Sequence, residues 1–385
     1  RGLGALFAYS PPHEHLWGQT GHVSYLSGWA NHDRIVDSAV VVPVSGRPAL
    51  LVAGDTYVFK LIGNVSPLED VRLVQSAESH VFDLVQPGSV PPTSPHPSFA
   101  AETLAILEEG GNSQKDVGVV GLNNMPVPFY EPLSRELGSK LRRVDDIVAE
   151  LRSVKSPEEI ELMKHAARLA DLGFETMLKV ARPGLQGIEI VAEMERVMRR
   201  EGADLAKFWI ASGPAPDFNN LRFEVKPHHR VLEEGDLMAA CSYVVYKGYW
   251  CHGHRAGSFM RPVPELEDLY SKVRGAADAG LSQMKPGVPV ARVARAMREK
   301  MAEYGIHQEA GGRVGHAIGL DYAELPIPAE GNETLLQSGM TFALHAGYPL
   351  PDPTKLGVPL GDMVRVTPEG FDFLTKFTRE PFLAG

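Results

Sequence analysis

The first part of the chain alternates short apolar runs with one helix-like segment. Residues 38–43 (SAVVVP) and 48–53 (PALLVA) are apolar runs, and residues 45–47 (SGR) between them are typical of a hairpin turn. The apolar spacing over residues 99–110 predicts a helix, and residues 117–121 (VGVVG) predict a buried strand. Together these segments predict a small α/β domain.

The pattern of apolar and polar residues changes near residue 150, shortly before a serine and a proline that favour the start of a helix. Ser156 is a typical N-cap residue, and Pro157 suits the first position of a helix. A long amphipathic helix is therefore expected as far as about Lys179. We place the domain boundary just before this helix, which predicts one domain over residues 1–150 and a second over residues 151–385.

The second domain contains an internal repeat. Each copy has a Pro-Gly pair, then two methionines on a helix, then a glycine. Residues that match lie 103 positions apart: Pro183 and Pro286, Gly184 and Gly287, Met194 and Met297, Met198 and Met301, Gly202 and Gly305. Chance could supply one such pair but hardly five within one helical unit. The alternative interpretation is an ordinary helix start and stop that is used twice. The repeat predicts two related halves with a ligand site between two related sheets.

Composition and charge exclude several classes of protein. Hydrophobic residues make up 44% and charged residues 22% of the chain, which is ordinary for a globular protein. The net charge of −10 argues against a nucleic-acid partner, because phosphate contacts need a basic face. No apolar run is long enough to span a bilayer, and the first four residues lack a signal pattern, so we expect a cytoplasmic protein without a membrane partner.

Three histidines are candidate ligands of a metal. His252, His316 and His345 each lie in a strand-like segment next to glycine. Imidazole is the commonest side-chain metal ligand near neutral pH. Three imidazoles suit a transition metal better than magnesium or calcium, which prefer oxygen ligands. We expect one divalent transition metal, iron or zinc in the first place, with manganese, copper and nickel as alternatives.

The second domain resembles the creatinase, prolidase and methionine aminopeptidase family. The motifs that carry the resemblance are residues 152–160 (RSVKSPEEI), the two Pro-Gly helix starts, and residues 212–214 (SGP), 234–236 (EGD), 246–249 (YKGY), 315–320 (GHAIGL) and 364–367 (VRVT). The resemblance implies an α/β (α+β) protein, with a small N-terminal domain of the creatinase and prolidase branch and a C-terminal domain of the pita-bread fold. It also implies a homodimer that acts on a small-molecule substrate.

The metal ligands that the resemblance implies are mostly absent from this chain. The family holds two metals with two aspartates, one histidine and two glutamates. The corresponding positions hold, in chain order, Cys241, His252, His316, His345 and Gly361. Asp362 cannot replace a ligand at position 361, because neighbouring residues of a strand face opposite sides of the sheet. We therefore expect one metal to be lost and one to remain on the three histidines, with an open coordination position.

Other side chains are candidates for catalysis. Glu324 matches a family glutamate and is a candidate proton carrier, or else it orients a ligand histidine. Tyr322 stands where the family usually has a second histidine and is a candidate hydrogen-bond donor to an oxyanion, or else a core or rim tyrosine. His254 shares a strand face with His252 and is a candidate acid/base. Cys241 is either a fourth ligand or a small buried residue.

Three residues are candidates for binding substrate. Arg255 fits an anion clamp, with a buried ion pair as the competing interpretation. Arg222 and His228 lie in residues 214–230, where relatives carry a substrate-binding histidine, although the local sequence departs from the peptidase pattern. The two cysteines, Cys241 and Cys251, exclude a scaffold built on disulfides, but they flank a predicted hairpin and could meet across it.

The leading hypothesis is an enzyme that hydrolyses a C–N bond of a small polar molecule with one metal held by three histidines. Water activated by the metal is the expected nucleophile. Three alternatives stay open at this point: an iron-dependent oxygenase or a lyase on the same site, a metal-free amidinohydrolase similar to creatinase, and a non-catalytic binding protein.

Overall fold

The computed structural model describes most of the chain, and it divides into two compact units, residues 1–152 and 153–385. The described residues are 2–11, 20–29, 36–53, 66–74, 98–215, 229–306, 314–347 and 357–385. The division falls close to the boundary that the helix signal at Ser156 indicates. None of the helices in the described ranges combines the length and the apolar character that crossing a membrane requires.

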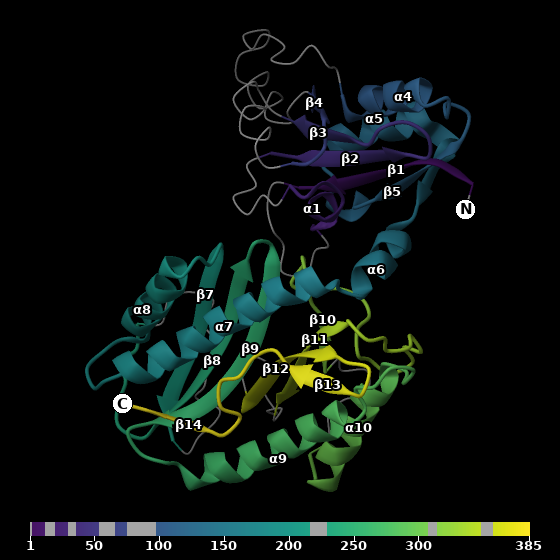
Figure 1. Cartoon of the computed structure of the whole chain (residues 1–385). Helices are drawn as coiled ribbons and strands as arrows, with labels where there is room; N and C mark the ends of the chain where they lie inside the picture. The colour runs from purple at the N-terminus through teal and green to yellow at the C-terminus, as the bar shows by residue number, and fades with distance from the viewer. Residues whose placement is uncertain are drawn as a thin grey trace. The chain divides into compact units, whose positions relative to one another are not determined.

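The N-terminal unit is a six-stranded mixed sheet with helices on both faces (Figure 1). The strand order is β4-β3-β2-β1-β5-β6, with bounds β1 Leu3–Ser10, β2 Ser38–Pro43, β3 Ala49–Ala53, β4 Asp70–Val74, β5 Asp116–Val120 and β6 Leu141–Arg143. The helices are α1 His22–Ser27, α4 Phe99–Glu109, α5 Val127–Leu137 and α6 Asp145–Ser153. The predicted hairpin of β2 and β3, the helix α4 and the strand β5 are confirmed.

Strand alternation divides the core of this unit between the two faces of the sheet. Phe7 and Val119 pack with Phe99 of α4 on one face, whereas Val40 packs with Val23 of α1 on the other. Because neighbouring residues of a strand point to opposite faces, strands buried on both sides become continuous apolar runs. The sequence shows this pattern in β2, β3 and β5.

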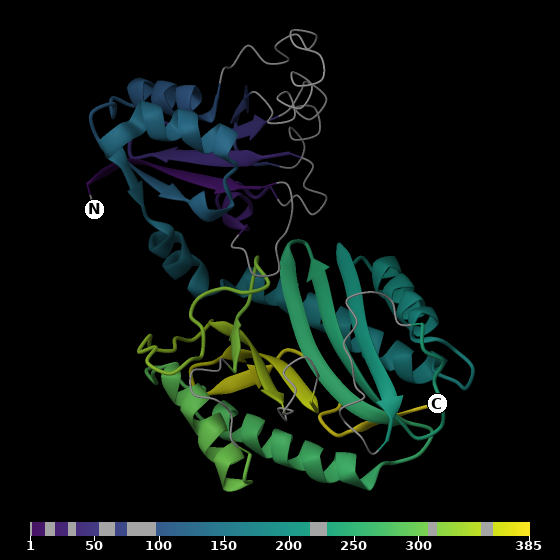
Figure 2. The ribbon, with the colours of Figure 1, turned by 180° about the vertical axis from the view of Figure 1, so that it is seen from behind.

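The C-terminal unit contains one curved eight-stranded sheet with long helices across one face (Figures 1 and 2). The main strand order is β10-β11-β12-β9-β8-β7, with bounds β7 Leu205–Pro214, β8 Asp236–Tyr246, β9 Tyr249–Phe259, β10 Gly315–Ala317, β11 Thr341–Gly347 and β12 Pro359–Val366. β13 (Phe371–Phe373) pairs with β12, and β14 (Phe382–Ala384) pairs with β9. The helices are α7 Pro157–Val180, α8 Gly187–Arg200, α9 Pro264–Leu281 and α10 Ala291–Glu303.

The internal repeat corresponds to two halves that lie on either side of the middle of this sheet. α7 packs on β8 and β9, and α9 packs on β11 and β12. Gly184 and Gly287 both adopt left-handed backbone angles, with φ of 87° and 81°, and all four repeated methionines are buried. However, the halves join through the pairing of β12 with β9, where Gly361 lies opposite His254. The prediction of two separate sheets was therefore wrong, since backbone pairing makes the halves one sheet.

Two local signals position the strands and helices that surround this junction. Ser156 caps α7 by accepting a hydrogen bond from the backbone N–H of Glu159, and the Glu159 carboxylate accepts one from the N–H of Ser156. Lys247 and Gly248 form the tight turn between β8 and β9, and both have positive φ. Such a two-residue turn fixes the register of the hairpin. It places Tyr243 opposite His252 on the neighbouring strand.

Candidate metal centre

Three strands of the C-terminal unit bring the candidate ligands together. His252 lies on β9, His316 on β10 and His345 on β11. Their potential ligand nitrogens all lie within 4.8 Å of one another. After small side-chain adjustments, this separation fits one ion at about 2.0–2.1 Å from each nitrogen. His252 and His316 are buried, and His345 is half-buried.

Backbone carbonyls fix the ring nitrogens of two of these histidines. The Nδ1 atom of His252 lies 2.7 Å from the carbonyl oxygen of Ser242, and Nδ1 of His316 lies 3.0 Å from the carbonyl oxygen of Ala317. A carbonyl only accepts hydrogen bonds, so each Nδ1 carries the proton and each Nε2 keeps a lone pair. This arrangement orients Nε2 as the metal ligand in many metalloproteins.

Tyr322 directly contacts the cluster. Its hydroxyl lies 3.0 Å from Nε2 of His252, and its ring lies 4.6 Å, between centroids, from the ring of His316. The side chain is 3% exposed. The structure therefore places Tyr322 beside the nitrogen that the Ser242 carbonyl leaves available.

The structure places Glu324 in a buried ion pair. Its Oε2 lies 2.7 Å from Nζ of Lys155, and both side chains are buried. Its Oε1 accepts a hydrogen bond from the backbone N–H of Asp321, and its own N–H donates to the carbonyl of Ala317. These contacts hold the segment that follows His316. They favour the interpretation that Glu324 orients the site over the alternative that it carries protons.

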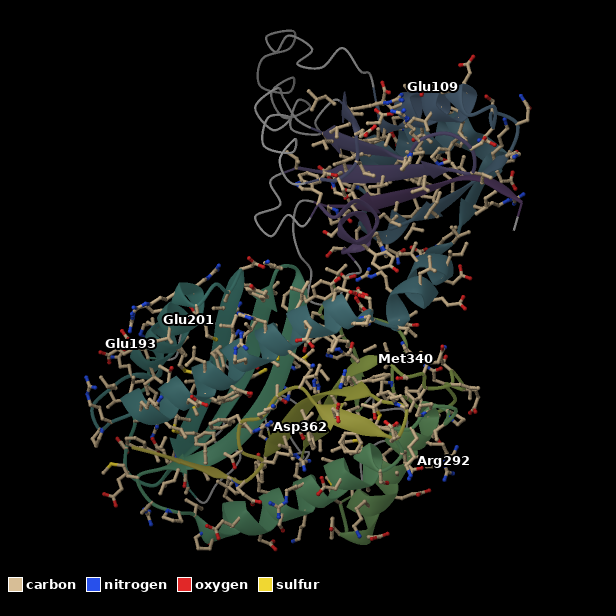
Figure 3. The ribbon with its side chains drawn as sticks, viewed as in Figure 1. Glu109, Glu193, Glu201, Arg292, Met340 and Asp362 are labelled. Carbon is tan, nitrogen blue, oxygen red and sulfur yellow. The ribbon has the colours of Figure 1, made fainter. Side chains whose placement is uncertain are left out.

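Arg255 also lies in a buried ion pair, which favours that competing interpretation over the anion clamp. Its Nη2 lies 3.0 Å from Oδ1 of Asp362, and the two side chains are 2% and 3% exposed. The guanidinium also donates to the carbonyls of Thr378, Phe377 and Gly361. These partners occupy the donor groups that a substrate anion would need. Figure 3 labels Asp362 on β12.

The two cysteines lie apart in the hairpin register. Cys241 pairs with His254 and Cys251 with Val244, and both thiols are free and buried. They therefore do not meet across the hairpin. The Sγ atom of Cys241 lies 3.8 Å from Nδ1 of His252, which is the protonated side of that ring. Burial raises the pKa of the Cys241 thiol above its usual value, which favours a small buried residue over a fourth ligand.

Burial disfavours the charged form of two imidazoles of this cluster. It lowers the pKa of His254 to about 3, and nearby Arg255 and His316 add to the effect. It also lowers the pKa of His252 well below its ordinary value, with further contributions from His254 and His316. Neutral imidazole is the form that binds metals. The ring of His254 lies 4.6 Å from that of His252 and 4.7 Å from that of His345, between centroids.

Sequence reasoning missed two side chains near the centre. Lys155 appeared only as part of a helix-start motif, and its partner Glu324 lies too far along the chain for a local pattern to reveal the pair. The ring of Tyr243 lies 4.8 Å from that of His252, between centroids. The alternation of β8 and its register with β9 could have indicated Tyr243. Arg222 and His228 lie outside the described residues.

The comparisons with known proteins agree with this fold. The model of metallopeptidase family M24 matches residues 161–368, more than half of the chain. The chain belongs to metallopeptidase family M24. It is 26% identical over 337 residues to a Xaa-Pro dipeptidase of Pyrococcus horikoshii, an alignment that covers 86% of this chain and 93% of that protein. It is 30% identical over 283 residues to an uncharacterized hydrolase/peptidase of Sinorhizobium fredii, covering 71% of this chain and 70% of that protein.

Solved structures with the same architecture match nearly the whole chain, including both units. The Xaa-Pro dipeptidase from Bacillus anthracis has a TM-score of 0.76 at 22% identity and covers 99% of this chain and 95% of that chain. The X-Pro aminopeptidase from Thermotoga maritima has a TM-score of 0.77 at 23% identity and covers 100% of this chain and 96% of that chain. At these identities the structures show the fold alone. They confirm the predicted prolidase-type fold with its extra N-terminal domain.

Proposed function

We propose that this protein is a hydrolase that cleaves a C–N bond of a small polar molecule with one divalent transition metal. His252, His316 and His345 would hold the metal. The observation that carries the proposal is the convergence of their ligand nitrogens within 4.8 Å, from three different strands. Membership of a metallopeptidase family supports metal-dependent hydrolysis as the reaction class.

The residues of this chain fit one metal better than the two that the family resemblance implies. The two groups of potential ligands in the described ranges contain histidine and cysteine but no carboxylate. The group of three histidines, His252, His316 and His345, leaves a coordination position open, as catalytic zinc sites do. A bound ion would supply Lewis acidity and would lower the pKa of a bound water molecule.

Protein side chains would then orient the substrate and stabilise charge. The Tyr322 hydroxyl lies 3.0 Å from Nε2 of His252 and donates to its lone pair in the metal-free chain; a bound ion would take that lone pair, and the hydroxyl could then donate to an oxygen that gains charge during hydrolysis. His254 is uncharged near neutral pH, because burial lowers its pKa to about 3. Its ring is therefore available as a neutral hydrogen-bond partner. Lys155 and Glu324 hold the segment that carries Tyr322.

Elemental analysis of the purified, unchelated protein tests this proposal. We expect about one equivalent of a transition metal per chain and its loss in the His252→Ala/His345→Ala variant. The control is His229→Ala, because His229 is exposed. Zinc would direct the substrate search toward C–N hydrolysis, and iron would favour the oxygenase or lyase alternative.

Two outcomes would contradict the proposal. Absence of metal even after reconstitution would leave the metal-free amidinohydrolase as the better hypothesis. Metal that persists in the double variant would place the ion on other residues.

A further inference from the structure

The place that the family resemblance assigns to a last carboxylate ligand is filled by an imidazole. Gly361 on β12 pairs with His254 on β9. A Cβ atom added to Gly361 would lie 2.8 Å from the backbone nitrogen of His254 and 3.0 Å from its Nδ1. Real Cβ atoms essentially never approach a backbone atom so closely, so a side chain at position 361 would require β9 or β12 to move. The packing of His254 therefore excludes a carboxylate at this position.

Two other carboxylates of this region are neutralised by cations of the protein. Asp362 contacts Arg255 at 3.0 Å and Arg379 at 2.8 Å. Glu324 contacts Lys155 at 2.7 Å. A carboxylate that is already paired gives little compensation to a further positive charge. Among the described residues, the candidate ligand groups consist of histidine and cysteine side chains and contain no carboxylate.

We propose that the centre takes an anionic ligand and that the substrate presents an anionic oxygen, such as a carboxylate, to it. The inference rests on the proposed function and names its substrate class. Imidazole binds a metal in its neutral form, so three imidazole ligands do not reduce the double charge of a bound ion. An isolated charge in a partly buried site is unfavourable. An anion from solution supplies the missing compensation.

Cobalt substitution gives a direct readout of this ligand, because the visible absorption of cobalt responds to its ligands. The cobalt-loaded protein would be titrated with acetate, with inorganic phosphate and with acetamide, a neutral molecule of nearly the same shape as acetate. We expect a saturable spectral change with acetate at a concentration at least about tenfold lower than with acetamide. Phosphate distinguishes a general anion site from one that selects carboxylates. An equal response to acetate and acetamide would overturn the inference.

A carboxylate introduced at the centre sharpens the test. His345→Glu should keep cobalt but weaken acetate binding by about tenfold or more, because the protein then supplies the negative charge itself. The matched control is His229→Glu, the same change at an exposed position. If His345→Glu does not bind cobalt, His254→Glu places the carboxylate on the neighbouring strand instead. Unchanged acetate affinity in a cobalt-binding variant would contradict the inference.

The two proposals fail in different ways. A protein that takes up no cobalt, zinc or iron would refute the proposed function. A protein that takes up cobalt but shows no acetate response would refute only the anionic ligand.

Discussion

The two faces of the β9–β12 junction carry opposite chemistry, although they are built from neighbouring residues. On one face, His254 lies against Gly361, and the nearby groups are the imidazoles of His252 and His345. On the other face, Arg255 and Asp362 form a buried ion pair with several backbone partners. The period of two residues along a strand separates the faces completely.

The difference shows that the fold keeps the buried ion pair of Arg255 and Asp362 on one face of the sheet and the candidate metal ligands on the other. Ionised groups are buried where each finds a partner, since an unpaired buried charge costs several kcal/mol. On the face with the histidines, the candidate ligand groups of the described residues contain no carboxylate. We therefore expect mutations on the face of Arg255 and Asp362 to change stability, and mutations on the face of the histidines to change metal and ligand binding.

Arg255→Met should have the largest effect on stability. It leaves Asp362 paired with Arg379 and removes the Arg255 donors from four backbone carbonyls, those of His254, Gly361, Phe377 and Thr378. Breaking a buried pair on one side typically lowers the free energy of unfolding by about 3–5 kcal/mol. Urea denaturation of the metal-free protein measures the loss. The double variant Arg255→Met/Asp362→Leu removes both charges, and it should recover part of the loss; no recovery would argue against an electrostatic cause.

Lys155→Met tests the second buried pair. We expect a loss of about 3 kcal/mol in the free energy of unfolding, because Glu324 keeps the N–H of Asp321 as a partner but loses its cation. Lys164→Met is the control, since Lys164 and Glu161 form an exposed pair, which contributes about 0–1 kcal/mol. Equal effects of the two variants would show that the Lys155 pair behaves as a surface pair.

Gly361→Ala tests the close approach between β12 and β9. The added Cβ atom would lie 2.8 Å from the nitrogen of His254, so we expect a loss of about 1–3 kcal/mol in unfolding free energy. Gly253→Ala is the matched control on the same pair of strands, where the nearest atom to the added Cβ is the carbonyl oxygen of Gly361 at 3.3 Å. Thermal denaturation of both variants decides whether the tighter contact costs more.

Asp171→Asn should have the smallest effect, a change in the pH dependence of stability. Burial raises the pKa of its carboxyl above the usual value, while the N–H groups of Lys376 and Phe377 and the charge of Arg255 oppose the shift. The folded state therefore binds this proton at higher pH than the unfolded state does. As pH falls through the raised pKa, the unfolding free energy of the natural protein should increase relative to Asp171→Asn. Parallel pH profiles of the two proteins would contradict the shift.

The sequence indicated the main elements because their signals are local. The capping residues Ser156 and Glu159 start α7 where expected, and the apolar runs of β2 and β3 form the predicted hairpin. The repeated Pro-Gly pairs correctly indicated two related halves. Strand alternation also excluded Asp362 from the histidine face, as the structure shows.

Partners that lie far apart in the chain were decided only by the tertiary structure. No local pattern pairs Lys155 with Glu324 or joins the two halves into one sheet at Gly361 and His254. Local spacing could identify Arg255 as a cation near the site, but only packing showed that Asp362 and four backbone carbonyls contact its guanidinium. The sequence alone determined which residue types are available and which face of each element they share, because these depend on backbone periodicity. Which charges are neutralised, and so which face is left for a ligand, depends on contacts between distant segments.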